Sequence, residues 1–236
     1  MFYSNTTRAV FLSRPNRFLA HALLNGTEII CHVKNTGRLK ELLIPGTPVI
    51  VQYHPDAAAQ GRKTEYSLIG IQKTTPGGPV WVNIDSQAPN AAAFEWLSEG
   101  TGLPFCPRPV NIRREVRYGQ SRFDLAFENG GRTWFMEVKG VTLEALPGTA
   151  CFPDAPTERG IKHLKELAEA VKNGCEAAVL FVIQMKGCTT FSPNPAQPEF
   201  AAALREAKKN GVHVFAYDCI ITENTMRLDR PVAVRL

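Results

Sequence analysis

Three residues near the middle of the chain could share a metal-dependent reaction: Asp124, Glu137 and Lys139, the last two in the string FMEVKGVTL. Two carboxylates placed close together repel each other unless a cation lies between them, and Mg²⁺ takes oxygen ligands while it keeps several waters. A metal ion held by these two acids could activate a water for attack on a phosphodiester. Lys139 could orient that water or pair with the developing negative charge.

The sequence around these residues predicts a β-hairpin. Two glycines, Gly130 and Gly131, separate the strings SRFDLAFE and TWFMEVKG, and a type I′ turn needs a positive φ at both central positions. Facing residues then have numbers that add up to 261, which puts Asp124 across from Glu137 with Lys139 on the same face. The same spacing also fits a solvated strand face on which an acid and the lysine form an ordinary ion pair. The opposite, apolar face would hold the pairs Phe123–Val138, Leu125–Met136 and Phe127–Trp134.

Other polar residues could complete such a site. Glu95 lies in a helical-looking segment, Pro89–Leu97, for which Asn90 is a plausible N-cap. Gln184 ends a predicted buried strand, where it could contact the metal site or a phosphate, or make only backbone hydrogen bonds. His163 lies on a predicted helix, where a lone histidine is more often structural or solvent-facing than functional.

The basic string NIRREVRYGQSRFD leads into the predicted hairpin. Arginine suits phosphate groups because its planar guanidinium group can bond two oxygens at once. The same arginines could instead balance nearby acids such as Glu95 and Glu115. The candidates for contact with a nucleic-acid backbone in this string are Arg114, Arg117 and Arg122.

The composition of the 236-residue chain indicates one large globular domain or two smaller ones, because 44% of the residues are apolar. No apolar run reaches the ~18 residues of a transmembrane helix, and the N-terminus lacks the pattern of a signal peptide. We therefore expect a cytoplasmic protein without a membrane partner. No two of the six cysteines form a CxxC pair, which favours reduced thiols over a zinc site. The cysteines are Cys31, Cys106, Cys151, Cys175, Cys188 and Cys219.

The net charge of +5 is distributed unevenly. Residues 1–84 contain nine Lys or Arg and four Asp or Glu, whereas residues 85–236 contain eighteen of each kind. This asymmetry suggests a basic N-terminal module with an anionic partner such as DNA. A basic surface without a function is the alternative.

The N-terminal part is predicted to be a small β-barrel, and an OB-fold is the natural interpretation of its short strands and turns. OB-folds bind single-stranded nucleic acid with basic loops and exposed aromatic residues. Phe18 and Tyr53 could stack on bases, although a core position is the better interpretation of each. The expected strands are Ala9–Leu12, Phe18–Leu24, Glu28–Val33, Pro48–Tyr53, Tyr66–Gln72 and Val80–Asn83. The basic residues at strand ends or in loops are Arg14, Arg17, Lys34, Arg38, Lys40, Arg62 and Lys63.

The part after the hairpin alternates between helices and strands. Thr157 is a reasonable N-cap for a helix that stops at Gly174, and Pro198–Asn210 forms a second helix. Buried strands are expected in AAVLFVIQ and VHVFAY. The order predicts a mixed α/β layer structure. We therefore expect an OB-like basic domain over residues 1–84 and an α/β domain over residues 85–236.

The chain resembles the sugar fermentation stimulation protein family in several strings, in family order: RPNRFLA, HVKNTGRLKELLIPG, REVRYGQSRFDLAF, EVKGVTL, FPDAPTERGIKHL and VLFVIQ. The resemblance implies an OB-like domain followed by an α/β domain of the PD-(D/E)xK nuclease superfamily. It also implies DNA binding without sequence preference and a regulatory link to sugar, especially maltose, metabolism.

The resemblance to the nuclease superfamily can be carried over residue by residue. The first acid of its motif corresponds to Asp124, and the acid-x-Lys string that follows corresponds to Glu137 and Lys139. Glu95 would be the usual additional acid. Gln184 stands where some members of the superfamily have a glutamine. The motif name calls for a proline before the first acid, where this chain has the phenylalanine of the string SRFDLAFE.

Three functions remain open on these grounds. The first is a DNA-binding protein with a Mg²⁺- or Mn²⁺-dependent nuclease site. The second is a non-catalytic DNA-binding regulator whose site is vestigial or holds a structural ion. The third is a phosphoesterase that acts on a small substrate. A homodimer is possible because many nuclease-like domains dimerise, but the sequence contains no decisive interface signal.

Overall fold

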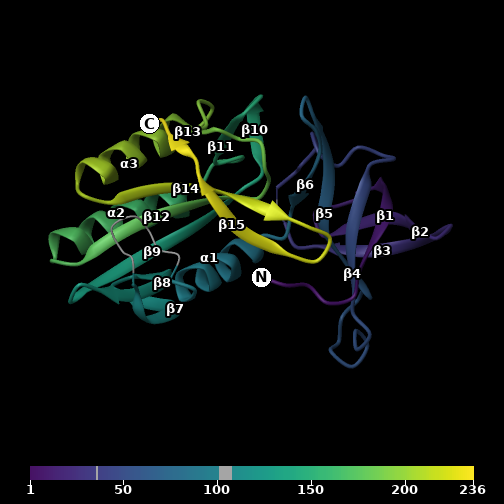
Figure 1. Ribbon diagram of the computed structural model, residues 1–236, viewed down its shortest axis with the longest axis horizontal. Helices are drawn as coiled ribbons and strands as arrows, with labels where there is room; N and C mark the ends of the chain where they lie inside the picture. The colour runs from purple at the N-terminus through teal and green to yellow at the C-terminus, as the bar shows by residue number, and fades with distance from the viewer. Residues whose placement is uncertain (36, 101–107) are drawn as a thin grey trace. The chain divides into compact units, whose positions relative to one another are not determined.

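The computed structural model describes residues 1–35, 37–100 and 108–236 (Figure 1). The chain forms two compact units. Unit 1 comprises Met1–Ala88, Gln184–Gly187 and Cys219–Arg227. Unit 2 comprises Pro89–Ile183, Cys188–Asp218 and Leu228–Leu236. The predicted domains are consecutive stretches of chain, whereas unit 1 also takes two short segments from the second half. The prediction for Cys106 lies outside the described residues.

Unit 1 is a β-barrel with one additional strand. Its strands are in the order β3-β2-β1-β4-β5-β6, and β3 also pairs with β5 in parallel, which closes five strands into a barrel. The predicted OB-like barrel is therefore confirmed. The strands are β1 (Thr6–Ser13), β2 (Leu19–Leu24), β3 (Thr27–Val33), β4 (Pro48–Tyr53), β5 (Tyr66–Thr75) and β6 (Gly78–Asn83).

The barrel interior is filled by alternate residues of these strands. Ala20 and Ala22 on β2 and Cys31 and Val33 on β3 are at most 1% exposed. Their neighbours Leu19 and His32 are half-buried, as the period of two along a strand requires for residues that face outwards. All six predicted strands are present, and most of them extend by one to three residues beyond the predicted ends.

Arg14 fastens the loop between β1 and β2 to the segment after β3. Its two terminal nitrogens donate four hydrogen bonds of 2.7 to 2.9 Å, and burial lowers the pKa of the guanidinium group. The acceptors are the backbone carbonyl oxygens of Arg17, Asn35, Gly37 and Arg38. Because these donors are occupied by backbone, Arg14 has a structural role in the barrel.

The main sheet of unit 2 is mixed. Its order is β15-β14-β12-β9-β8-β7, in which β7, β8 and β9 are antiparallel and β9, β12 and β14 are parallel. The strands are β7 (Val110–Tyr118), β8 (Ser121–Asn129), β9 (Arg132–Val141), β12 (Glu176–Ile183), β14 (His213–Ile221) and β15 (Met226–Pro231). A second sheet has the order β10-β11-β13-β16, with β10 (Leu143–Leu146), β11 (Thr149–Phe152), β13 (Thr190–Pro193) and β16 (Ala233–Val234).

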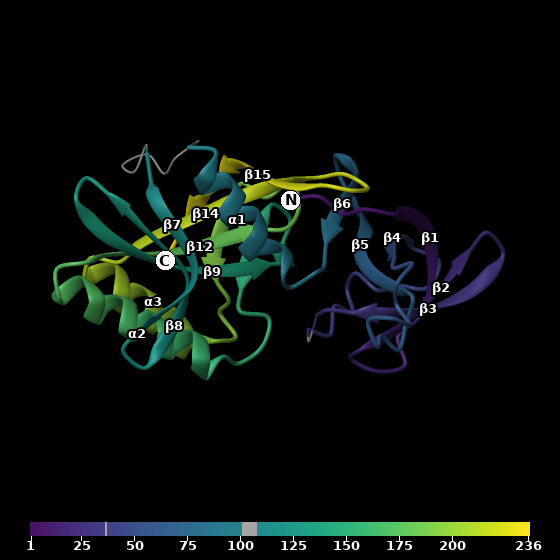
Figure 2. The ribbon, with the colours of Figure 1, turned by 90° about the horizontal axis from the view of Figure 1, so that it is seen from below.

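Helices cover both faces of the main sheet (Figure 2). On one face lie α2 (Glu158–Lys172) and α3 (Pro198–Lys209). On the other lies α1 (Ala88–Ser98), whose Trp96 packs against Tyr217 of β14 with ring centroids 4.8 Å apart. The mixed α/β fold predicted for this part of the chain is therefore confirmed.

The sequence predicted the N-cap of one helix correctly and that of another wrongly. Thr157 is the N-cap of α2, as predicted, and its hydroxyl accepts from the N–H of Gly160. The N-cap prediction for Asn90 is wrong, because α1 begins at Ala88 and Asn90 lies in its first turn. Asp85 instead accepts hydrogen bonds just ahead of this helix, through its side chain from Gln87 and through its carbonyl from Ala88.

Strand β7 was expected only as a basic string that leads into the hairpin. It pairs along much of its length with β8, but Asn111 and Glu115 have positive φ values of 53° and 56°. These two residues break the period of two that identifies a strand in a sequence. The short strands β10, β11, β13 and β16 were likewise not predicted.

Two further observations concern the described residues of both units. The described cysteines are free thiols. No helix in the described ranges combines the length and the apolar composition that a membrane crossing requires.

We expect Arg14→Met to lower the free energy of unfolding by about 2 kcal/mol, because hydrogen bonds to a charged group contribute about 1.5–3 kcal/mol and their loss would leave carbonyl groups unsatisfied. Arg17→Met is the matched control, since Arg17 is exposed in the same loop. Urea unfolding followed by circular dichroism would measure both variants. Equal stability of the two would contradict the structural role of Arg14.

Candidate functional site

The β8–β9 hairpin positions the candidate site. The two glycines at its tip have φ values of +60° and +76°. The strands pair from Asn129↔Arg132 to Leu125↔Met136, so the paired numbers add up to 261. The register predicted for this part of the hairpin is therefore confirmed.

The ladder of backbone pairs ends just before Asp124. At this point the Asp124 side chain takes the place of a backbone partner, because its Oδ2 accepts a 2.8 Å hydrogen bond from the N–H of Val138 on β9. Asn90 of α1 donates to the other oxygen, Oδ1, at 2.7 Å. The Asp124 carboxylate thus lies against the backbone of β9, next to Glu137, and Asn90, which was predicted to be an N-cap, instead contacts this candidate site residue.

The sequence predicted that Phe123 would face Val138 on the apolar side of the hairpin, but it does not. Its ring lies 5.5 Å from that of Phe135 and 6.3 Å from that of His163, between centroids. Phe135 and Glu137 share one face of β9, because residues two apart on a strand point the same way. The alternation predicted for β8 therefore fails where this strand leaves β9.

Glu137 is a carboxylate in the interior of unit 2, only 3% exposed. Its Oε1 accepts a 2.6 Å hydrogen bond from Nζ of Lys139 and another from Nδ1 of His163 on α2. Burial by itself raises the pKa of Glu137, but the hydrogen bond from His163 and the charge of Lys139 outweigh it and hold the pKa below its ordinary value. The second oxygen, Oε2, is buried and has no hydrogen-bond partner among the described residues.

His163 is buried against Glu137, which fits the structural alternative predicted for it and not the solvent-facing one. It is 5% exposed, and its Nε2 accepts a 3.4 Å hydrogen bond from Nε of Arg159 one turn earlier. An acceptor at Nε2 requires the proton to be on Nδ1, which is the nitrogen that faces Glu137. The available sequence signal was its spacing of four from Leu167, which places both residues on the buried side of α2.

Asp124 lies in a different electrostatic environment. Burial raises its pKa to about 6, and the charge of Glu137 adds to that rise. The hydrogen bond from Val138, the charge of Lys139 and the hydrogen bond from Asn90 act in the opposite direction without cancelling it. The two acids of the predicted pair are thus close enough to influence each other.

The two carboxylates fit the requirements of a hard divalent cation. Mg²⁺ is commonly held by one or two carboxylates, with waters and phosphate oxygens as the other ligands. A cation would relieve both the unpaired, buried Oε2 of Glu137 and the raised pKa of Asp124. Across residues 1–35, 37–100 and 108–236 there is no group of three or more His, Cys, Asp or Glu that could hold a metal. Asp124 and Glu137 would supply two carboxylate ligands.

The other two predicted site residues are Glu95 and Gln184. Glu95 is exposed on α1, and the α1 side chain that reaches Asp124 is Asn90. Gln184 is buried in unit 1, where its Nε2 donates to the carbonyl oxygens of Asn83 and Asp85 at 3.0 and 3.2 Å. These bonds correspond to the backbone-bonding alternative considered for Gln184.

The basic residues predicted for unit 1 fall into two groups. Arg14 is bonded to backbone carbonyls, and Nζ of Lys34 lies 3.3 Å from Oδ2 of the buried Asp85. The others line cavities: Arg17, Arg38 and Lys40 are exposed and line one of about 640 Å³, whereas Arg62 and Lys63 line another. The structure thus brings three of the predicted phosphate-binding residues together at one surface.

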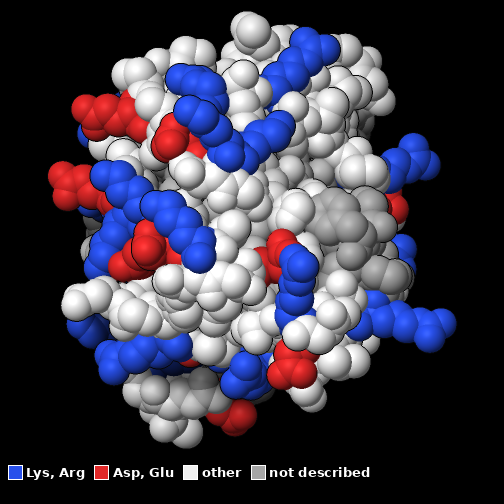
Figure 3. Space-filling view, turned by 90° about the vertical axis from the view of Figure 1, so that its left-hand side faces the viewer, with Lys and Arg blue, Asp and Glu red and all other residues white. Residues whose placement is uncertain are grey.

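The arginines predicted for unit 2 have local partners in two cases. The guanidinium group of Arg114 lies 5.5 Å from the ring centroid of Phe94, and Nε of Arg122 lies 2.7 Å from Glu115. Arg117 is exposed. Figure 3 shows basic and acidic side chains interleaved on the face that it draws. That face therefore has no continuous field of one sign.

Comparisons with known proteins agree on one family. Residues 12–84 match the SfsA N-terminal OB domain, and residues 87–225 match the Sugar fermentation stimulation protein RE domain. Sugar fermentation stimulation protein homologs of Desulfitobacterium hafniense (strain Y51) and Ruminiclostridium cellulolyticum are 48% and 44% identical to the chain; each comparison covers 100% of this chain, and 99% and 100% of the relatives. The solved structure of Pyrococcus furiosus SfsA in complex with Ca²⁺ has a TM-score of 0.84 and 28% identity, over 100% of this chain and 98% of that one.

We expect the stability advantage of Asp124→Asn over the wild type to grow between pH 4 and pH 7. Folding raises the pKa of Asp124 from 3.8 to about 6. Such an acid stabilises the fold fully only at a pH below its pKa in the unfolded chain. This contribution is lost as the pH rises through its pKa in the folded protein. The wild type alone should lose about 3 kcal/mol in this way. Urea unfolding of both proteins at each pH, with EDTA present, measures the difference. An advantage independent of pH would contradict the raised pKa.

Proposed function

Because the chain belongs to the sugar fermentation stimulation protein family, we propose that it binds DNA largely without sequence preference and contains a Mg²⁺- or Mn²⁺-dependent nuclease site. The observation that carries the nuclease site is the buried Glu137 with Lys139 and His163, beside the Asp124 carboxylate. A regulatory role in sugar, especially maltose, metabolism is the wider context that we propose for this DNA binding.

The DNA-binding part of the proposal is supported by unit 1. It contains a closed OB-like barrel, the architecture that presents loops and a strand face to oligonucleotides. The whole net charge of +5 comes from residues 1–84. The cavity lined by Arg17, Arg38 and Lys40 gathers three exposed cations at one surface, which suits contact with successive phosphates.

The nuclease part is supported by the chemistry of the residues in unit 2. Asp124 and Glu137 would hold the cation, which when bound supplies Lewis-acid chemistry to a phosphodiester. The Pyrococcus furiosus relative was solved with Ca²⁺, a hard cation that takes oxygen ligands as Mg²⁺ does. This supports a site for such a cation in the present chain.

Each neighbouring side chain has a separate task. Asn90 and the Val138 N–H orient the Asp124 carboxylate, and His163 orients that of Glu137. Lys139 keeps 17% of its side chain exposed, so its ammonium group can also stabilise negative charge on a phosphate.

A non-catalytic DNA-binding regulator is the second candidate. One observation favours it: Lys139 and His163 already satisfy Oε1 of Glu137 and hold the pKa of this acid below its ordinary value. The cluster could therefore serve as a structural feature of the fold. DNA cleavage in the presence of metal distinguishes this function from the first.

We expect Glu137→Gln to reduce metal-dependent DNA cleavage by at least about a hundredfold, because it removes a negatively charged metal ligand. DNA affinity in EDTA should remain unchanged, since glutamine retains an oxygen that can accept the hydrogen bond from His163. Purified protein would be incubated with single-stranded, duplex and branched DNA in EDTA, Mg²⁺ or Mn²⁺.

Glu128→Gln is the matched control for this experiment, because Glu128 lies on β8 of the same hairpin and bonds only Asn111 in the described structure. Cleavage that survives Glu137→Gln would refute the assignment of the site. Retarded but uncut DNA under every condition would favour the regulator.

We expect the double variant Arg38→Gln/Lys40→Gln to make the salt dependence of DNA binding shallower by about two in the slope of log K against log [salt], because each lost phosphate contact lowers the slope by about one. The control removes two exposed charges from the end of α3, with Lys208→Gln/Lys209→Gln. Fluorescence anisotropy between about 50 and 200 mM salt gives the slopes. Equal slopes for both variants would show that the cavity of Arg17, Arg38 and Lys40 does not contact phosphate.

A further inference from the structure

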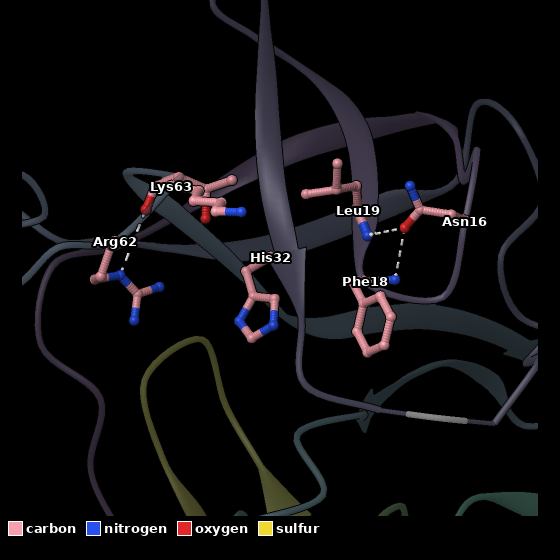
Figure 4. A pocket seen from close by; sticks show the side chains of 7 residues that line it. Asn16, Phe18, Leu19, His32, Arg62 and Lys63 are labelled. Atoms are coloured by element: carbon pink, nitrogen blue, oxygen red, sulfur yellow. Dashed lines mark hydrogen bonds between the residues drawn. The ribbon is translucent and has the colours of Figure 1, made fainter.

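A second cavity in unit 1, of about 510 Å³, lies on the outer surface of the barrel (Figure 4). Its floor belongs to β2 and β3, where Leu19 pairs with His32. Its walls come from the loop between β1 and β2, with Asn16 and Phe18, and from the segment before β5, with Arg62 and Lys63. None of the described residues that line this cavity is an acid.

Phe18 is an exposed aromatic residue on a fixed backbone. Its side chain is 61% exposed, so the core position expected from the sequence is wrong. The N–H groups of Phe18 and Leu19 both donate to Oδ1 of Asn16, at 2.8 and 3.0 Å. The Phe18 carbonyl accepts a 2.8 Å bond from the N–H of Val33. The exposed ring is therefore available to a ligand, and the backbone that carries it is already ordered before the ligand arrives.

Arg62 is held in place on the other side of the cavity. Its Nη2 donates to Oγ of Ser67 at 2.9 Å, and its Nε donates to the carbonyl of Thr64 at 3.4 Å. No ion pair joins Arg62 or Lys63 to an acid among the described residues, so both charges can take an anion. In Figure 4 the His32 ring lies between the Arg62 guanidinium group and the Phe18 ring.

His32 presents a neutral ring inside this arrangement. Burial lowers its pKa, and the positive charges of Arg62 and Lys34 lower it further. A neutral imidazole next to an exposed phenyl ring provides an aromatic surface, and the adjacent cations provide a site for negative charge. A nucleotide combines the two complementary groups, since every base has a π-face and carries a phosphate nearby.

We propose that this cavity binds a nucleotide, with the base against Phe18 and His32 and the phosphate against Arg62 and Lys63. The inference rests on the proposed DNA binding and deepens it: single-stranded DNA is preferred to duplex, because stacked and paired bases cannot enter the cavity. Asn16 also lines the cavity of Arg17, Arg38 and Lys40. The two cavities are therefore neighbours. One DNA strand can place a base in the cavity of Phe18 and His32 while its phosphates lie in the cavity of Arg17, Arg38 and Lys40.

The test uses the full-length protein in EDTA and compares Phe18→Ala with Phe2→Ala. Phe2 is the matched control because it is 67% exposed in the same unit and lies outside the cavity. Fluorescence anisotropy would measure the affinity for a fluorescent oligothymidylate and for a duplex of the same length. Calorimetry would measure the binding of thymidine monophosphate. We expect the wild type to prefer the single strand, and Phe18→Ala to weaken single-strand binding by about tenfold, in the range found for loss of one base–aromatic stack.

The outcomes separate this inference from the function on which it rests. If Phe18→Ala binds the single strand as tightly as Phe2→Ala does, the proposal that this cavity binds a nucleotide is overturned, while the proposed DNA binding stands. A wild type that prefers duplex would overturn the single-strand preference. Absence of binding to any DNA would remove the proposed function; thymidine monophosphate binding that depends on Phe18 would then support the cavity with a free nucleotide as its ligand.

Discussion

The buried carboxylate of Glu137 constrains much of unit 2. An ionised carboxylate inside a protein loses several kcal/mol of hydration and is tolerated only when cations and hydrogen-bond donors surround it. Lys139 supplies a charge from the same strand, two residues further on, and His163 supplies a donor from α2. For His163 to reach this face of the sheet, α2 must lie across β9 in one position. The N-cap at Thr157 starts the helix one and a half turns before His163.

The departure of β8 from β9 follows from the same need to satisfy polar groups. Where the backbone ladder ends, the N–H of Val138 would lack a partner, and the Asp124 carboxylate accepts it instead. An aspartate in this position faces the edge of β9 beside Glu137, so the two acids raise the electrostatic energy of the site together. The irregular backbone and the paired acids are therefore one feature, which agrees with a site that a cation would stabilise.

The sequence predicted those parts that depend on local patterns. The turn glycines and alternating residues gave the hairpin register, and capping chemistry gave the start of α2 at Thr157. It could not predict the partners of polar side chains, because these depend on which helix face meets which strand. The sequence therefore predicted neither the bond of Asn90 to Asp124 nor that of His163 to Glu137. Strand β7 was missed because two residues with positive φ interrupt its alternation.

The loop between β1 and β2 shows most clearly why residue type alone does not reveal function. Arg14 and Arg17 are chemically identical and three residues apart, yet one is bonded to four backbone carbonyls and the other lies exposed beside a cavity. The fastened Arg14 fixes the loop that carries Arg17 and leads to Phe18. An exposed cation and an exposed ring lose less conformational entropy on binding when their backbone is already ordered. In the proposed nucleotide site, a structural arginine would therefore aid recognition by ordering the loop that carries the contacting residues.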